Sequence, residues 1–194
     1  MNKILLGCLA LAGSIFTSCA GNKAESTTTD AESENNSKVL VAFYSATGTT
    51  RKAAEEIATA TGGKLYEIVP EHLYTAADLN WHDQNSRSSV EMKDMAVRPA
   101  IKNGTVNLDD IETIFIGYPI WWDQAPRVVN TFIDENNLAG KKIITFCTSG
   151  GSTINGSTTT LKETYPDLDI AQGICVNSSS TEDFNSWIES LNLK

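Results

Sequence analysis

Short apolar runs alternate with longer helical stretches from residue 38 to the end of the chain. The apolar runs are rich in β-branched and aromatic residues, and Pro70 and Pro119 end two of them. In the stretches between them, apolar residues recur at helical spacing, as Ala54, Ile57 and Ala58 do. This alternation predicts βαβ units and therefore a parallel sheet covered by helices. The predicted strands are residues 39–44, 64–69, 113–118, 142–147 and 170–176.

Sequence signals mark the ends of several helices predicted between and after these strands. Gly62 ends the first helix, because glycine readily adopts the left-handed conformation of a C-terminal cap. Pro126 suits the first turn of the next helix. Ser180 and Asp183 have the spacing of a capping box at the start of the last helix. The predicted helices are residues 50–61, 125–136, 154–164 and 181–191.

Residues 70–112, which we call the excursion, interrupt this rhythm between the second and third predicted strands. They contain no convincing full-length amphipathic helix. Segments of this length are usually functional or disordered. Disorder is the weaker interpretation, because Tyr74, Trp81, Met92 and Met95 make the excursion too apolar and aromatic for a solvated linker. We therefore expect it to serve the function of the domain.

The first residues have the pattern of an export signal. Lys3 precedes an apolar stretch at residues 4–16, and small residues follow it. This stretch is shorter than the roughly 20 residues that a membrane-spanning helix needs. Residues 1–18 are therefore predicted to be a signal peptide rather than a permanent transmembrane anchor.

Residues 16–19, Phe-Thr-Ser-Cys, resemble the lipobox of bacterial lipoproteins, which implies lipidation of Cys19. Ordinary cleavage nearby is the alternative. Residues 20–37 are rich in Ser, Thr, Asn, Glu and Ala and carry no large apolar side chain, so they are predicted to be a disordered tether. The chain thus divides into a signal peptide at 1–18, a lipidated cysteine and tether at 19–37, and a domain at 38–194, held at the bacterial cell envelope by its lipid alone.

Charge and cysteine content exclude several function classes. The net charge is −9, and nucleic-acid binding draws on clustered Lys and Arg that this chain lacks. No CxxC, HxxxH or HxH pattern occurs, so a protein-ligated metal centre is not expected. Cys147 and Cys175 are the two cysteines of the predicted domain, and they are expected to be buried free thiols rather than a disulfide.

The loop after the first predicted strand has the composition of a phosphate site. Ser45, Thr47, Thr49 and Thr50 place four hydroxyls around Gly48 at the start of a helix. Backbone N–H groups and the helix dipole at such a start favour an anion. Capping of the helix by these side chains is the simpler alternative. The loop lacks the lysine of GxxxxGK[ST], and GxGxxG is absent, which disfavours ATP hydrolysis and classical NAD binding.

Two further loops follow the third and fourth predicted strands and should meet the first one, because ligands of such sheets bind beyond the carboxyl ends of the strands. Residues 119–123, Pro-Ile-Trp-Trp-Asp, offer indole faces for a flat heterocycle, although packing is the commoner role of tryptophan. Residues 148–152, Thr-Ser-Gly-Gly-Ser, allow close backbone approach.

These three loops, and residues 44–50 above all, resemble the FMN-binding loops of the flavodoxin family. The resemblance covers residues 38–194. It implies a flavodoxin-like, three-layer α/β fold with a five-stranded parallel sheet of order 2-1-3-4-5 and helices on both faces. It also implies noncovalent FMN. The cofactor-binding residues that it implies are Ser45, Thr47, Gly48, Thr49 and Thr50 at the phosphate and Pro119, Ile120, Trp121, Trp122, Asp123, Thr148, Ser149, Gly150 and Gly151 around the ring.

Two positions depart from the family's common pattern. Thr49 stands where asparagine is common, a mild change because hydroxyl and backbone donors remain. Asp123 stands where relatives often have glycine. Its charge would disfavour an anionic reduced flavin nearby, so we hypothesise a lowered redox potential.

The resemblance implies electron transfer, either as a carrier between redox partner proteins or as an FMN-dependent reductase of a small acceptor such as a quinone. The excursion slightly favours a reductase, with Trp81, Arg87 and Arg98 as a substrate lid. A surface pair of Arg87 with Glu91 is the alternative for that arginine. The alternative for the whole chain is a non-catalytic, envelope-tethered module that binds a phosphorylated ligand or a protein partner.

Overall fold

The computed structural model describes residues 37–193. The predicted signal peptide, Cys19 and most of the predicted tether lie outside these residues. No helix of the described part is long and apolar enough to cross a membrane.

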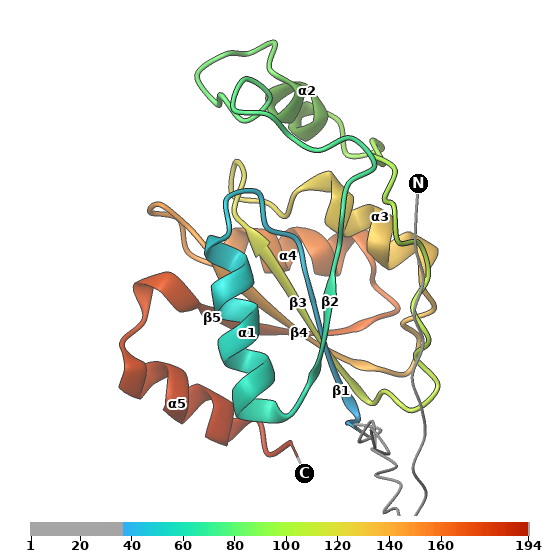
Figure 1. The fold of residues 1–194 in the computed structure, drawn as a ribbon, viewed down its shortest axis with the longest axis vertical. Helices are drawn as coiled ribbons and strands as arrows, with labels where there is room; N and C mark the ends of the chain where they lie inside the picture. The colour runs from blue at the N-terminus through green and yellow to red at the C-terminus, as the bar shows by residue number, and fades with distance from the viewer. Residues whose placement is uncertain (1–36, 194) are drawn as a thin grey trace, which may run out of the picture. The chain divides into compact units, whose positions relative to one another are not determined.

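A five-stranded parallel sheet of order β2-β1-β3-β4-β5 forms the centre of the domain (Figure 1). The predicted fold class and strand order are therefore confirmed. The strands are β1 (Val39–Phe43), β2 (Lys64–Glu67), β3 (Thr113–Pro119), β4 (Lys142–Thr148) and β5 (Asp169–Cys175). The helices are α1 (Thr49–Thr61), α2 (Arg87–Lys93), α3 (Arg127–Glu135), α4 (Asn155–Thr164) and α5 (Thr181–Ser190), with a short 3₁₀ turn, η1, at Val176–Ser178.

Two hydrophobic layers enclose the sheet, because successive strand side chains point to opposite faces. Leu40 and Ala42 of β1 pack into the layer beneath α3 and α4, whereas Val41 and Phe43 pack into the layer beneath α1 and α5. The central strands β1 and β3 are buried on both sides, as their unbroken apolar runs predict. Figure 1 shows the two helix pairs on opposite faces of the sheet.

The strand register brings three strand ends to one edge of the sheet. Phe43 of β1 pairs with Gly117 of β3, and Pro119 of β3 pairs with Thr148 of β4. Gly117 is required there, because a Cβ atom at this position would lie 2.0 Å from the ring of Phe146. The loops after β1, β3 and β4 consequently begin next to one another, at the point where strand order reverses.

The excursion leaves the sheet after β2 and returns before β3. An antiparallel bridge between Pro70 and Ile101 closes its base, with Glu71 N donating to Ala100 O at 2.8 Å. The seven-residue helix α2 lies inside it, a helix that the sequence pattern did not predict. In Figure 1 the excursion stands beyond the carboxyl ends of the strands, on the same side as the three loops.

Candidate functional site

A cleft of about 770 Å³ lies at the carboxyl edge of β1, β3 and β4. This volume falls within the roughly 300–1,000 Å³ of small-molecule and cofactor sites. Three strand-to-helix loops and the excursion form its walls. The lining residues are Ala46, Thr47, Leu79, Trp81, Ser88, Pro119, Ile120, Trp121, Trp122, Ser149, Gly150, Gly151 and Ser152.

The loop between β1 and α1 is shaped by one serine and one glycine. Ser45 Oγ accepts from the N–H groups of Gly48 at 3.1 Å and Arg51 at 3.2 Å. Gly48 precedes the helix with φ +90°, a conformation that strains any residue with a side chain. Ser45 thus folds the loop, as the capping alternative anticipated.

The entrance of α1 retains free donors despite this cap. Within residues 37–193, the N–H groups of Thr49 and Thr50 and the hydroxyls of Thr47 and Thr49 make no hydrogen bond. Thr47 and Thr49 are exposed, and Thr47 lines the cleft. Unpaired N–H groups at a helix N-terminus, with hydroxyls beside them, suit an anionic group.

The hydroxyl of Thr50, in contrast, forms a hydrogen bond inside the protein. Thr50 is buried, and its Oγ1 lies 2.8 Å from Oγ1 of Thr148, the last residue of β4. This bond ties the first loop to the third. Thr50 and Thr148 therefore hold the two loops together rather than lining the cleft.

The loop after β4 is held from the neighbouring edge of the sheet. Asn177 Oδ1 accepts from Ser149 N, and Asn177 Nδ2 donates to Ser149 O, both at 2.9 Å. Ser149 Oγ in turn accepts from the N–H groups of Gly151 and Ser152, at 3.1 and 2.7 Å. The two glycines leave open backbone facing the cleft.

The loop after β3 is a tight turn with two residues in the left-handed region. Trp121 and Gln124 exchange both backbone hydrogen bonds at 3.0 Å, and between them Trp122 has φ 47° and Asp123 has φ 57°. These are the angles of the mirror-image hairpin turn that normally carries Asn or Gly. The turn presents Trp122, 42% exposed, at the cleft and directs Asp123 to solvent.

Two aromatic rings, those of Tyr44 and Tyr74, pack against Trp121 of this turn. Trp121 meets Tyr44 edge-on at 5.7 Å and Tyr74 of the excursion at 5.2 Å between ring centroids. Tyr44 is buried, and its hydroxyl has no hydrogen-bond partner among residues 37–193. Burial raises the pKa of the Tyr44 phenol, so it stays neutral at any physiological pH.

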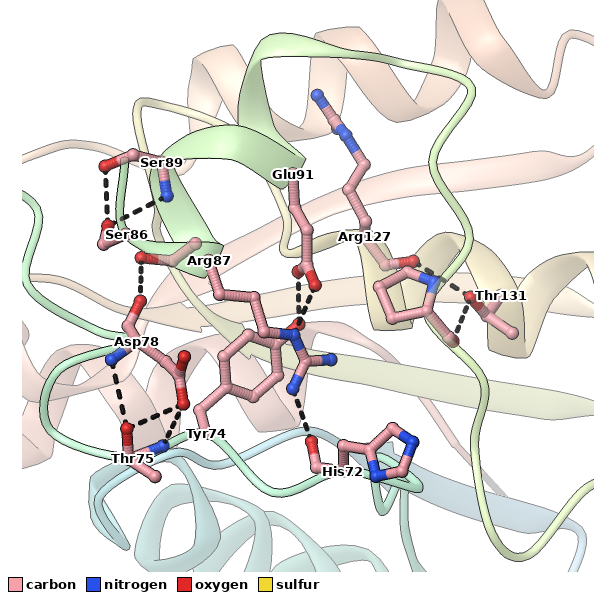
Figure 2. Close-up of polar contacts among 12 residues, drawn as sticks. His72, Tyr74, Thr75, Asp78, Ser86, Arg87, Ser89, Glu91, Arg127 and Thr131 are labelled. Carbon is pink, nitrogen blue, oxygen red and sulfur yellow. Dashed lines mark hydrogen bonds and ion pairs between the residues drawn. The ribbon is translucent and has the colours of Figure 1, made fainter. Parts of the chain in front are cut away.

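The excursion is folded around a buried carboxylate, as Figure 2 shows. Glu91 is 8% exposed; it accepts from Arg87 Nε at 2.6 Å and from the Tyr74 hydroxyl. Arg87 also donates to His72 O at 2.6 Å and covers the Tyr74 ring at 3.9 Å. Burial, and then the hydrogen bond to Glu91, raises the pKa of the Tyr74 phenol.

The predicted lid residues have different positions in the structure. Trp81 lines the cleft, 63% exposed, with its ring 3.5 Å from that of His82. Arg87 does not line the cleft, because its guanidinium forms an ion pair with Glu91. This pair is the alternative considered for Arg87, but it is partly buried rather than on the surface. Arg98 does not line the cleft either and pairs with Asp134 of α3.

A buried arginine connects the excursion to the turn that carries the tryptophans. Arg127 is 1% exposed and donates to the carbonyls of Met92 and Asp94 at the end of α2, both at 3.1 Å. It also donates to Gln124 Oε1 at 2.9 Å. Burial, and then the charge of Arg98, lowers the pKa of Arg127, yet a guanidinium stays protonated in proteins.

Sequence reasoning missed part of the cleft wall. Leu79 and Ser88 come from the excursion, where the sequence pattern predicted Trp81, Arg87 and Arg98 instead. Ala46 and Ser152 belong to recognised loops and could have been included by position. Predicted residues that do not line the cleft are Ser45, Gly48, Thr49, Thr50, Asp123 and Thr148. Five of these shape or terminate its loops, and Thr49 carries the free donors described above.

Residues 37–193 contain no cluster of His, Cys, Asp and Glu that could hold a metal ion. Cys147 and Cys175 are both free, the first buried and the second half-buried. The pair of helix-cap residues Ser180 and Asp183 forms the predicted capping box.

Comparison with known sequences and structures gives one consistent family. The sequence profile of the flavodoxin family matches residues 38–191. The crystal structure of a proposed flavoprotein from Bacteroides eggerthii is 51% identical, with a TM-score of 0.77, and the match covers 81% of this chain and 99% of that one. A second, from Bacteroides uniformis, is 48% identical, with a TM-score of 0.76 and coverage of 79% and 98%.

A more distant structure shares the fold. The flavoprotein from Lactobacillus acidophilus, solved in complex with FMN, is 21% identical, with a TM-score of 0.62 and coverage of 78% of this chain and 98% of that one. No curated protein matches the chain.

Proposed function

Because the chain belongs to the flavodoxin family, we propose that it binds FMN in the cleft and uses it to pass electrons to a small acceptor at the cell envelope. The observation that carries the proposal is the cleft itself. It is lined by Thr47, which lies next to the start of α1, and by tryptophan and glycine residues, at the reversal of strand order where such sheets bind ligands. Bound FMN supplies the ability to accept and release electrons.

The donor set of the first loop fits the phosphate of FMN. Two unpaired N–H groups and the hydroxyls of Thr47 and Thr49 would offer donors to an anion without any lysine. Donors of this kind bind a monophosphate through hydrogen bonds and the helix dipole. The solved Lactobacillus flavoprotein with FMN and the family membership support the same assignment.

The remaining walls fit a flat ring. Trp121 and Trp122 offer aromatic surface to the cleft, and the Ser149 loop offers open backbone at Gly150 and Gly151. Bulky side chains at these glycines would narrow the space. The residues of the chain therefore hold, orient and shield the cofactor, whereas no side chain of the described cleft is placed to act as a catalytic base.

The excursion favours reduction of a small acceptor over transfer to a protein alone. Leu79, Trp81 and Ser88 extend the lining of the cleft beyond the three loops and would offer contacts to a second planar molecule. Trp81 offers an exposed indole for stacking on a quinone. Residues 1–18 and Cys19 support delivery of the domain to the cell envelope.

Steady-state turnover with NADH or NADPH and a short-chain quinone tests the choice of acceptor. We expect turnover by the FMN-loaded chain, and Trp81→Ala should raise KM for the quinone about tenfold with FMN affinity unchanged. Leu73→Ala is the matched control, since Leu73 is an exposed excursion residue outside the cleft lining. Reduction of a redox protein without quinone turnover would support the electron-carrier function instead. Absence of both activities would contradict the redox proposal.

A further inference from the structure

Two cysteines lie side by side near the carboxyl ends of β4 and β5. Cys147 of β4 and Cys175 of β5 are direct partners in the parallel register. Paired residues of parallel strands point to the same face, and both cysteines belong to the layer beneath α3 and α4. Adjacent strands are about 4.8 Å apart, within the range of about 4.4–6.8 Å between Cα atoms joined by a disulfide.

The thiol of Cys175 is linked to the cleft through one side chain. Its Sγ donates to Asn177 Oδ1 at 3.6 Å, and Asn177 is the residue that holds Ser149 by two backbone hydrogen bonds. Ser149 organises the loop that carries Gly150 and Gly151. A change at Cys175 therefore reaches the cofactor cleft through a single intermediate residue.

Reagents can reach this position. Cys175 is half-buried on the edge strand of the sheet, and a cavity of about 290 Å³ lies beside it. Ser149, Gly151 and Ser152 line the same cavity. Cys147 is fully buried and burial raises the pKa of its thiol, whereas Cys175 is half-buried, so Cys175 is the group that an external disulfide reaches first.

We propose that Cys147 and Cys175 form a reversible disulfide that loosens the Ser149 loop and so weakens cofactor binding. The Cβ atoms must approach to roughly 3.8 Å, closer than the strand spacing, so closure draws the end of β5 toward β4. That movement removes the S–H donor from Asn177 and displaces the residue that clamps Ser149.

The reaction is a thiol–disulfide exchange with a low-molecular-weight disulfide as the oxidant. The Cys175 thiolate attacks one sulfur of the external disulfide, which breaks that S–S bond and releases one thiolate. The Cys147 thiolate then attacks the mixed disulfide at the sulfur of Cys175 and releases the second thiolate. Two protein thiols are oxidised, one external disulfide is reduced to two thiols, and the protons pass to the released thiolates and solvent.

The effect on FMN depends on the proposed function, whereas the bridge and the loop movement do not. The test uses the full chain carrying Cys8→Ser and Cys19→Ser, so that only the two thiols of interest remain. It is treated with oxidised or reduced glutathione. Intact mass then reports the loss of two hydrogen atoms, and amide hydrogen exchange reports the Gly151 and Ser152 N–H groups that donate to Ser149 Oγ.

We expect the bridge to form, the two amides to exchange about tenfold faster, and FMN affinity to fall about tenfold, all reversed by reduced glutathione. Cys147→Ser and Cys175→Ser are matched controls that should show none of these changes. Free thiols or only a glutathione adduct after oxidation would overturn the proposal, as would a bridge with unchanged amide exchange. If the reduced chain binds no FMN, the proposed function fails, and mass and exchange still decide the disulfide.

Discussion

At the residue scale, the turn after β3 places two side chains in a backbone conformation that they normally avoid. Trp122 and Asp123 both have positive φ, next to the cleft. Each left-handed residue other than glycine costs roughly 1–2 kcal/mol. Such strain persists only where surrounding contacts impose it, and it is concentrated at functional sites. Here the contacts are the two Trp121–Gln124 backbone bonds and the support of Trp121 by Tyr44 and Tyr74.

Asp123→Gly should relieve this strain and remove a negative charge beside the cleft. We expect the free energy of unfolding to rise by about 1 kcal/mol, because glycine adopts positive φ without steric cost. We also expect a higher reduction potential of the FMN-loaded chain, since the lost carboxylate no longer opposes negative charge on the ring. Urea unfolding and an anaerobic reductive titration measure the two effects. An unchanged potential would dispose of the electrostatic role assigned to Asp123.

Gly48→Ala should weaken FMN binding about tenfold, because alanine at φ +90° shifts the loop that aims the free N–H groups. Fluorescence titration of FMN measures the affinity. Gly62→Ala is a matched control: Gly62 also has positive φ, at the other end of α1, and neither glycine has an atom within 4 Å of an added Cβ. Equal loss of affinity in both variants would show that stability of α1, not loop geometry, governs binding.

At the scale of elements, α2 is held in place by α3 rather than by its own sequence. Seven residues are too few for a stable isolated helix. Ser86 caps the start of α2, and the buried Arg127 binds the carbonyls of Met92 and Asp94 at its end. Because Arg127 also binds Gln124, the excursion and the tryptophan turn are fixed by the same guanidinium.

Arg127→Met should lower the free energy of unfolding by roughly 2–3 kcal/mol, because it leaves the buried Met92 carbonyl and the half-buried Asp94 carbonyl without this donor. Hydrogen exchange should accelerate most in residues 87–95 and around Trp121. Lys38→Met is the control, since its ion pair with Glu112 is exposed to solvent and should contribute little to stability. A uniform acceleration across the domain would mean that Arg127 supports the whole core and not the excursion specifically.

The sequence predicts the sheet well because each central strand is specified locally by an unbroken apolar run, such as Thr113–Pro119. The three cleft loops follow from their place after those strands. Helix α2 and the role of Arg127 could not be predicted, since they depend on contacts between segments far apart in the chain, such as Arg127 with Met92. The Arg87–Glu91 pair is local, and it is one of the two alternatives that the sequence predicts for this arginine. The left-handed backbone conformation of Trp122 could not be predicted for a similar reason, because it depends on the packing around Trp121.

At the scale of the whole molecule, buried phenols make stability sensitive to alkaline pH. Burial raises the pKa of Tyr118 to about 12, whereas its ordinary value is 10.0. Above about pH 10 the unfolded chain loses this proton while the folded chain keeps it, so stability falls as pH rises toward 12.

Tyr118→Phe should therefore flatten the alkaline loss of stability, by up to roughly 3 kcal/mol near pH 12. Urea midpoints of the variant and the parent at neutral pH and above pH 10 measure this difference. The variant itself should be slightly less stable at neutral pH, because Ser157 Oγ loses the hydrogen bond from the Tyr118 hydroxyl. Parallel alkaline curves for both proteins would contradict the assignment to Tyr118.

The central claim concerns the cleft as a site for FMN, and visible absorption of the chain after mixing with FMN and gel filtration tests it most directly. We predict that flavin bands elute with the protein, and that riboflavin is retained far less, because the free donors at the start of α1 require a phosphate. If the folded chain elutes without flavin after mixing with FMN and also after mixing with riboflavin, the claim is contradicted. Another phosphorylated ligand would then be the candidate for the cleft.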